Sequence, residues 1–452
     1  MTRSPRSRWL VAAAGVSSLA LVMSGCSSDS EVAGDAGSAP ATDCAAYEQY
    51  GDLAGKEVNV YASILSPELE MYEAAYVPFE ECTGANIKFE GSAEFEAQLK
   101  VREKAGNPPD IALIPQPGLL ANQVATGSVK KPSATTEANI DANWQPIWKD
   151  YGSVDGEFYA APNSSNLKSL VWYSPSMFAD NGWTIPATWD ELKALTDTIV
   201  ASGIVDKPWC AGFGSGDATG WPGTDWVEDV MLRLHGPEVY DQWVNHEIPF
   251  NDPKVAAALD EVGYFLKNES YVNGGYGGVE TIASTTFQDG GLTILDGTCA
   301  LHRQAQFYAG QWPEGTNIAE DGDVFAFYLP PADPATTPVL GGGEFITAYA
   351  DRPEVVAAQE WLATADYANS LARNSTGLAS ANLNADATLF TGIAKVATDA
   401  LVDPDAQFRF DGSDAMPAAV GAGSFWVGMT QWITGKSTQD TLDFIEKSWP
   451  KS

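Results

Sequence analysis

The chain has 452 residues, of which 44% are hydrophobic and 11% aromatic, and its formal net charge is -35 at pH 7. This length can bury a sizeable core and suggests two or three lobes. A charge this acidic argues against a nucleic-acid partner and against adsorption to an anionic membrane surface, because both require clustered Lys and Arg.

The chain begins with the features of a bacterial lipoprotein signal. Three arginines precede a short apolar run, and the run ends in Leu21-Val22-Met23-Ser24-Gly25-Cys26. The run is too short to cross a bilayer as a stable helix, so we expect residues 1–25 to be a signal peptide that is removed. The small residues before Cys26 are typical of a lipobox and predict lipidation of Cys26. The alternative is an ordinary signal peptide that leaves Cys26 to form a disulfide bond.

The segment after the signal is rich in Ser, Ala, Gly and Asp and has almost no large apolar side chain. Such a segment buries too little surface to offset the entropy lost on ordering. We therefore expect residues 26–44 to be a flexible tether that holds a folded domain at the outer face of the cytoplasmic membrane. No later segment is long and apolar enough to span a bilayer.

Short apolar runs then alternate with segments of helical periodicity. The patterns predict strands at 58–61, 87–90 and 110–114, with helices at 68–81 and 93–105 between them. Strand–helix alternation of this kind indicates a parallel α/β sheet. Further along, the patterns predict strands at 169–173 and 325–328 and helices at 189–200, 226–234, 237–244, 253–267, 353–367 and 425–435.

Four cysteines remain in the part expected to be exported, namely Cys44, Cys82, Cys210 and Cys299. An even number in an oxidising compartment favours two disulfide bonds, and three pairings are open. A metal site is the competing interpretation, but there is no C-x-x-C motif, and the spacing of His235, His246 and His302 does not suit a ligand set. We expect no bound metal.

The chain has none of the usual catalytic motifs. There is no G-x-S-x-G, no P-loop, no G-x-G-x-x-G and no H-E-x-x-H. Paired carboxylates of a glycoside hydrolase remain open, because only a structure shows which acidic side chains lie roughly 5 to 9 Å apart. The sequence therefore does not require an enzyme, and we expect no cofactor.

Several tryptophans lie beside glycine and proline rather than inside apolar runs. Trp221 and Trp226 flank a Pro-Gly-Thr-Asp segment, and Trp426 follows Gly-Ser-Phe. Indole faces stack on the C–H patches of sugars, while carboxylates, amides and guanidinium groups bind the hydroxyls. This mixture suits a neutral, polyhydroxylated ligand. The alternatives are that the tryptophans belong to the core and that Glu94 and Asp225 stabilise helix N-termini.

The order and spacing of several short segments resemble family 1 extracellular solute-binding proteins of ABC transporters. The resemblance extends from about Gly55 to the end, and parts of it are similar to the α-glucoside-binding branch. The segments that carry it are residues 79–85 (FEECTGA), 107–111, 186–192, 219–226 (TGWPGTDW), 297–304 (GTCALHRQ), 413–417 and 424–426.

The resemblance implies an α/β fold of type II, as in periplasmic binding proteins, with two lobes, three crossover segments and a ligand cleft between the lobes. Lobe 1 would comprise residues 45–165 plus 324–373, and lobe 2 residues 166–323 plus 374–452. The crossovers would lie near 162–168, 331–340 and 374–381. Within this arrangement we prefer the pairing Cys44–Cys82 and Cys210–Cys299, because each bond then joins segments of one lobe.

The resemblance also implies the ligand-binding residues. Lobe 1 would contribute hydrogen bonds through Ser63, Ser92, Glu94, Gln116, Gly342, Gly343 and Glu344. Lobe 2 would contribute Trp221 and Trp426 as stacking platforms, with Asp225, Arg303 and Gln304 as polar partners. The chain departs from the family at Ser63-Ile64-Leu65, where charged residues are common.

The function implied is capture of an oligosaccharide, an α-glucoside of the maltose or trehalose type, and its delivery to the membrane subunits of an ABC importer. We expect a lipid-anchored monomer. Another sugar or a glycosylated osmolyte is the alternative cargo. A lipid-anchored glycoside hydrolase and a surface scaffold without a small ligand are the alternatives from other classes.

Overall fold

The structure is a computed structural model that describes residues 43–451. The predicted signal peptide, the lipidation of Cys26 and nearly all of the predicted tether lie outside these residues. Across the part that is described, every helix is too short or too polar to cross a bilayer.

The first sheet has five strands in the order β2-β1-β3-β13-β6. β1, β2 and β3 are parallel, as the alternation of strands and helices predicted, and β13 and β6 add antiparallel pairings. All four residues of β3 are buried, which explains its unbroken apolar run. The bounds are β1 (Glu57–Ala62), β2 (Asn86–Gly91), β3 (Ile111–Ile114), β6 (Ala160–Pro162) and β13 (Phe345–Ala348).

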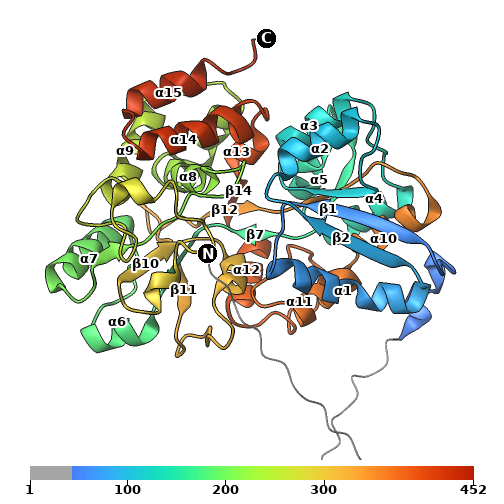
Figure 1. Ribbon diagram of the computed structural model, residues 1–452, viewed down its shortest axis with the longest axis horizontal. Helices are drawn as coiled ribbons and strands as arrows, with labels where there is room; N and C mark the ends of the chain where they lie inside the picture. Colours follow the sequence, from blue (N-terminus) through green and yellow to red (C-terminus); the bar gives the residue numbers. More distant parts are fainter. Residues whose placement is uncertain (1–42, 452) are drawn as a thin grey trace, which may run out of the picture. The chain divides into compact units, whose positions relative to one another are not determined.

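Helices α1 and α10 pack against this sheet (Figure 1). The two helices contact each other through aromatic side chains. The rings of Phe79 in α1 and Trp361 in α10 stack with centroids 5.0 Å apart, and Tyr76 packs edge-on against the same indole. The helices near this sheet are α1 (Glu68–Thr83), α2 (Phe95–Lys104), α3 (Pro117–Ala125), α4 (Ala134–Asn143), α5 (Pro146–Tyr151), α10 (Pro353–Leu362) and α11 (Ala365–Asn374), with a hairpin of β4 (Ser153–Val154) and β5 (Glu157–Phe158).

The second large sheet has four strands in the order β11-β8-β10-β9. Their bounds are β8 (Leu170–Tyr173), β9 (Lys207–Trp209), β10 (Cys299–Arg303) and β11 (Phe325–Tyr328). β11 pairs antiparallel with β8 along its whole length, so the prediction that lobe 1 resumes at residue 324 is wrong for this strand. An apolar run indicates that a strand is buried but not which sheet it joins.

The remaining helices are α6 (Pro175–Asn181), α7 (Trp189–Ser202), α8 (Trp221–Val244), α9 (Pro253–Leu266), α12 (Gly392–Val402), α13 (Gly412–Ala415), α14 (Trp426–Ile433) and α15 (Thr438–Glu446). α7 matches its prediction because both ends are encoded locally. The Thr188 side chain accepts the backbone N–H of Glu191, and Gly203 ends the helix at φ 62°. The helices predicted at 226–234 and 237–244 form α8, which begins at Trp221 and breaks at Gly236.

A third, small sheet contains the connections between the two large sheets. Its order is β14-β12-β7, with β7 (Asn166–Leu167), β12 (Pro338–Gly342) and β14 (Gln407–Phe410). β7 joins β6 of the first sheet to β8 of the second, and β12 joins β11 to β13. Ala379, in the third predicted crossover, forms a β-bridge with Ser165 just before β7. The segments that connect the halves are therefore hydrogen-bonded to one another, and Figure 1 shows the small sheet at the centre.

The structure contains two disulfide bonds, Cys44–Cys82 and Cys210–Cys299, which is the pairing that the two-lobe arrangement favoured. The first ties a short 3₁₀ helix (Cys44–Tyr50) to the C-terminal turn of α1. The second ties the residue after β9 to the first residue of β10. Each bond therefore stays within one of the two halves.

Replacing either pair of cysteines with alanine should destabilise the protein by about 2–5 kcal/mol. The bonds close segments of 38 and 89 residues, so the loop entropy released by losing Cys210–Cys299 is larger by roughly 0.8 kcal/mol. Burial of Cys210 and Cys299 adds a packing loss. Urea unfolding of the two double variants measures the difference, and a larger cost at Cys44–Cys82 contradicts it.

Candidate functional site

A cavity of about 550 Å³ lies between the two halves of the fold. From the first sheet it is lined by Ser63, Ala93 and Gln116, which follow β1, β2 and β3. The carboxyl ends of parallel strands meet at one edge of a sheet, and ligands bind in the crevice outside that edge. The volume is within the range of roughly 300–1,000 Å³ that small-molecule sites occupy.

The structure divides the predicted ligand-binding residues into two groups. The cavity is lined by Ser63, Gln116, Trp221, Gly343, Glu344 and Trp426. Ser92, Glu94, Asp225, Arg303, Gln304 and Gly342 are not among the lining residues. The members of the second group have other roles, and each has a physical reason.

Ser92 and Glu94 belong to a turn whose middle residue, Ala93, lines the cavity in their place. The Ser92 hydroxyl accepts the backbone N–H of Glu94 at 3.2 Å, so it stabilises the turn. This turn lies close to Gly216 of the other half, which also lines the cavity. Gly216 has φ +56°, and a Cβ there would lie 2.7 Å from the Ala93 carbonyl oxygen, so the two halves of the fold meet at this point.

Asp225 and Arg303 lie beneath the cavity in a buried ion cluster. Arg303 donates from Nη1 to Asp225 at 3.1 Å and from Nε to Asp229 at 3.0 Å, and all three side chains are fully buried. Arg233, one turn further along α8, completes the pairing by donating to Asp229 at 2.5 Å. Arg233 and Arg303 outweigh the effect of burial and hold the pKa of Asp229 below its ordinary value. This cluster stabilises the core rather than binding a ligand directly.

Lys168 connects the cluster to the cavity. It lies between β7 and β8, lines the cavity, and donates to Asp225 at 3.0 Å and to Asp411. Burial alone would raise the pKa of Asp411, but Lys168 lowers it to about 2. The pKa of Asp225 is raised to about 7, because burial and the nearby Asp411 outweigh Lys168 and Arg303. The cavity floor thus presents an ammonium and a carboxylate side by side.

Gln304 and Gly342 support neighbouring groups. The side-chain oxygen of Gln304 accepts a hydrogen bond from the backbone N–H of Ala305 at 2.9 Å. The backbone carbonyl of Gln304 accepts one from the indole N–H of Trp172 at 3.1 Å. At Gly342 an added Cβ would lie 2.9 Å from Cε of Lys168. Gly342 therefore leaves room for the lysine side chain, and it does not line the cavity to which it was predicted to contribute a hydrogen bond.

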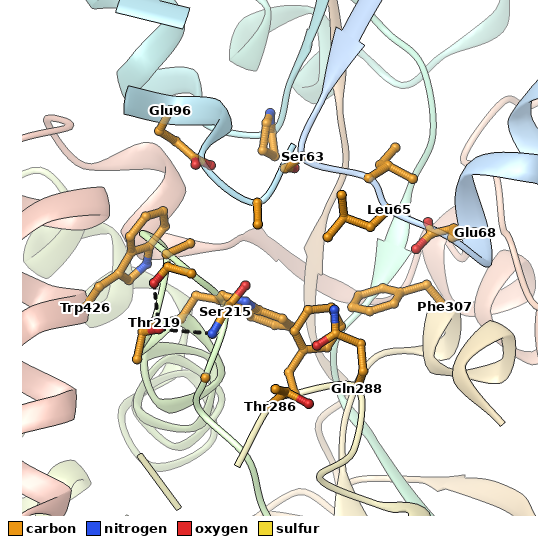
Figure 2. Close-up of a pocket in the computed structure, with 18 of the residues that line it drawn as sticks. Ser63, Leu65, Glu68, Glu96, Ser215, Thr219, Thr286, Gln288, Phe307 and Trp426 are labelled. Carbon is orange, nitrogen blue, oxygen red and sulfur yellow. Dashed lines mark hydrogen bonds between the residues drawn. The ribbon is translucent and has the colours of Figure 1, made fainter. Parts of the chain in front are cut away.

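Aromatic rings form one wall of the cavity. Trp221 packs against Phe287 and Phe307, with centroids 5.1 Å and 6.2 Å away. The Lys168 ammonium lies 5.6 Å from the Trp221 centroid. Trp426, at the start of α14, lies on the opposite side of the view from Phe307 (Figure 2). Its indole N–H is buried and has no hydrogen-bond partner.

Sequence reasoning missed several lining residues: Glu68, Glu96, Lys168, Phe287, Phe307, Asp411 and Asp414. Glu68 and Glu96 had a usable signal, because each lies in the first turn of a helix that follows a strand of the first sheet. The two phenylalanines had no such signal, because no feature of the sequence distinguishes them from phenylalanines of the core.

One group of three carboxylates in the described chain could approach a metal ion. Oxygens of Asp225, Glu228 and Asp411 lie within 4.8 Å of one another. The Lys168 ammonium already bonds to two of these residues. Burial and the neighbouring Asp411 and Asp225 raise the pKa of Glu228 well above its ordinary value, which disfavours the charged form of this carboxyl. The group therefore already contains a lysine ammonium and a carboxyl whose ionisation is disfavoured.

The sequence model of the family described as "Bacterial extracellular solute-binding protein" matches residues 62–369. The chain belongs to this family. Its members are receptors that bind a substrate, not enzymes. The family assignment made from the sequence is confirmed.

Two relatives are similar to this solute-binding protein over most of its length. One is the "Alpha-glucosides-binding periplasmic protein AglE" of Rhizobium meliloti, with 38% identity over 88% of each chain. Another is the "Osmoprotective compounds-binding protein GgtB" of Synechocystis, with 37% identity over 91% of this chain and 96% of the relative.

Solved structures show the same fold at low identity. The bacterial solute receptor AcbH has a TM-score of 0.72 at 16% identity, covering 87% of this chain and 97% of its own. A chitin oligosaccharide binding protein has a TM-score of 0.71 at 16% identity, covering 86% and 97%. The two-lobe fold of type II predicted for this solute-binding protein is confirmed.

The ion cluster should be important for stability. Asp229→Ala leaves the guanidinium groups of Arg233 and Arg303 buried without their shared partner, and we expect a loss of about 3–5 kcal/mol in the free energy of unfolding. The matched control is Asp399→Ala, which removes an exposed partner of Lys395 and should cost less than about 1 kcal/mol. Denaturant unfolding measures the free energy of unfolding of both variants. A loss for Asp229→Ala as small as that of the control would show that the cluster does not stabilise the protein.

Gly216→Val should weaken ligand binding without unfolding the protein. The added side chain meets the Ala93 carbonyl and keeps the two halves apart, so the closed state loses stability relative to the open one. Gly435→Val, at a positive-φ glycine with open space around it, is the control for backbone strain alone. Small-angle scattering with and without ligand reports closure, and normal closure in the Gly216 variant contradicts the assignment.

Proposed function

We propose that this protein captures a glycoside, an α-glucoside of the maltose or trehalose type, and delivers it to an ABC importer from a lipid anchor on the outer face of the membrane. The observation that supports this most directly is the cavity itself. It combines indole faces at Trp221 and Trp426 with hydrogen-bonding carboxylates from both halves of the fold. Such a lining suits a molecule with apolar C–H faces and many hydroxyls.

Relatives support the same class of cargo. AglE, similar over 88% of both chains, is named for binding α-glucosides. GgtB is named for binding osmoprotective compounds and is nearly as similar, which favours a glycosylated osmolyte as the second candidate. Both candidates share a glycosyl unit, so the same stacking platforms serve either.

The mechanism is capture by closure. A ligand that contacts Ser63 and Gln116 on one side and Trp221 on the other gains part of these contacts only when the halves approach, and it stabilises the closed state by that difference. The small sheet of β7, β12 and β14 carries the movement, because these strands link the halves. The membrane subunits of the importer then recognise the closed, loaded form.

Trp221→Ala should weaken glycoside binding by about 2 kcal/mol or more, the range for a tryptophan at the centre of a site. Trp221 is partly exposed in the cavity wall, so its loss should change stability little. Trp426→Ala should also weaken glycoside binding, with an added stability cost because this indole is buried. Calorimetry with maltose, trehalose and a glucosylated polyol measures affinity and identifies the cargo.

Trp449→Ala is the matched control, because Trp449 stacks on His246 and does not line the cavity. We expect it to bind normally. Retention of binding in both cavity variants contradicts the proposed platforms.

A further inference from the structure

One side chain of the cavity lining comes from the connection between the two halves. Lys168 follows β7, and its backbone N–H bonds to the Leu340 carbonyl of β12 at 2.8 Å, so it is attached to the small central sheet. Side chains alternate along an extended segment, and Leu167 is fully buried. Asn166 and Lys168, on either side of Leu167, therefore share the opposite face, and both line the cavity.

The ammonium group of Lys168 has more hydrogen-bond donors than the ion cluster uses. It donates to Asp225 at 3.0 Å and to Asp411, and within residues 43–451 no other acceptor of its Nζ is found. An ammonium has three N–H donors, so one remains. The side chain is 9% exposed, and the cavity that it lines is the space next to this exposed part. The third donor is therefore available to a molecule in the cavity.

The amine of Lys168 stays charged in this position. Burial acts to lower the pKa of Lys168, but Asp225 and Asp411 outweigh burial and hold the pKa well above its ordinary value. Hydrogen bonds in which the donor is ionised are roughly twice as strong as neutral ones. A ligand oxygen that accepts from Lys168 therefore gains more than one that accepts from a neutral donor such as Ser63.

The ammonium lies beside the aromatic wall of the cavity. Its Nζ is 5.6 Å from the ring centroid of Trp221, which in turn packs against Phe287. A sugar that contacts an indole through its C–H groups carries hydroxyls around the rim of its ring. A sugar unit in contact with Trp221 therefore lies next to the ammonium as well, with its hydroxyl oxygens as the acceptors nearest to the third N–H.

We propose that Lys168 binds the glycoside directly, by donating a charged hydrogen bond to one hydroxyl oxygen of the sugar unit that contacts Trp221. This inference rests on the proposed function and adds a specificity-determining residue to it. A sugar without that hydroxyl leaves a donor of a buried charged group unpaired, so Lys168 discriminates against it.

The test uses whichever of maltose, trehalose and a glucosylated polyol binds most tightly, with derivatives in which one hydroxyl position of the glucosyl units is replaced by hydrogen. Calorimetry on the wild-type protein should show one derivative binding at least about tenfold more weakly than the parent sugar, the range for a lost hydrogen bond to a charged group. In Lys168→Met the ratio of the two affinities should fall to about one for that derivative, as in a double-mutant cycle, and persist for the others.

A purely structural role for Lys168 would give a different result. Loss of the ammonium leaves two buried carboxylates with fewer partners, and a distortion of the site would weaken the binding of all the sugars alike without changing their ratios. Lys193→Met is the matched control. Lys193 also bonds to a carboxylate, that of Glu261, and lies 4.5 Å from the ring centroid of Tyr264, but it does not line the cavity. We expect this variant to keep both the affinities and their ratios.

A crystal structure of the wild-type complex with the same sugar gives a check that does not depend on the folding of a variant. One sugar oxygen should lie about 2.7–3.2 Å from Nζ of Lys168. A bound sugar with no oxygen in this range, or ratios that are all unchanged in Lys168→Met, overturns the inference and leaves the proposed function standing. If maltose, trehalose and a glucosylated polyol all fail to bind, the proposed function itself fails, and the inference fails with it.

Discussion

The arrangement of the site depends on one buried ammonium group. Lys168 comes from the segment between β7 and β8, and it bonds to Asp225 of α8 and to Asp411 just after β14. These residues are remote in sequence, yet each belongs to or adjoins an element that passes between the halves or borders the cavity. Ionised groups in a dry interior are costly unless they are paired, so each must find its partners. That requirement fixes α8, and with it Trp221, relative to the small central sheet.

Most of the fold could be predicted from sequence because its signals are local. The parallel strands of the first sheet follow from apolar runs alternating with helical periodicity, and α7 follows from Thr188 and Gly203 at its ends. The sheet membership of β11 could not be predicted, because pairing with β8 is a long-range event between two apolar strands. The Asn-rich and Gly-rich connections also gave no indication that they would join as one sheet.

The sequence predicted which types of residue form the site better than it predicted which side chains reach the cavity. Trp221 and Asp225 are four residues apart on α8 and therefore lie on the same helical face. The tryptophan reaches the cavity, whereas the aspartate lies one turn deeper and pairs with Lys168 and Arg303. The sequence placed both residues just before the helix predicted at 226–234 and gave the carboxylate a ligand-binding role, whereas the structure places both on α8 and the carboxylate in the ion cluster. Phe287 and Phe307 are far from Trp221 in sequence, and only the folded structure brings their rings beside it.

Each disulfide bond lies within one half of the fold, so neither bond links the two halves. Cys44–Cys82 lies beside α1, and Cys210–Cys299 lies at the edge between β9 and β10, so neither bond crosses the cavity. Each bond therefore constrains one half of the fold and leaves the distance between the halves free to change. A protein built in this way gains resistance to unfolding from its disulfide bonds without a covalent restriction on movement between its halves.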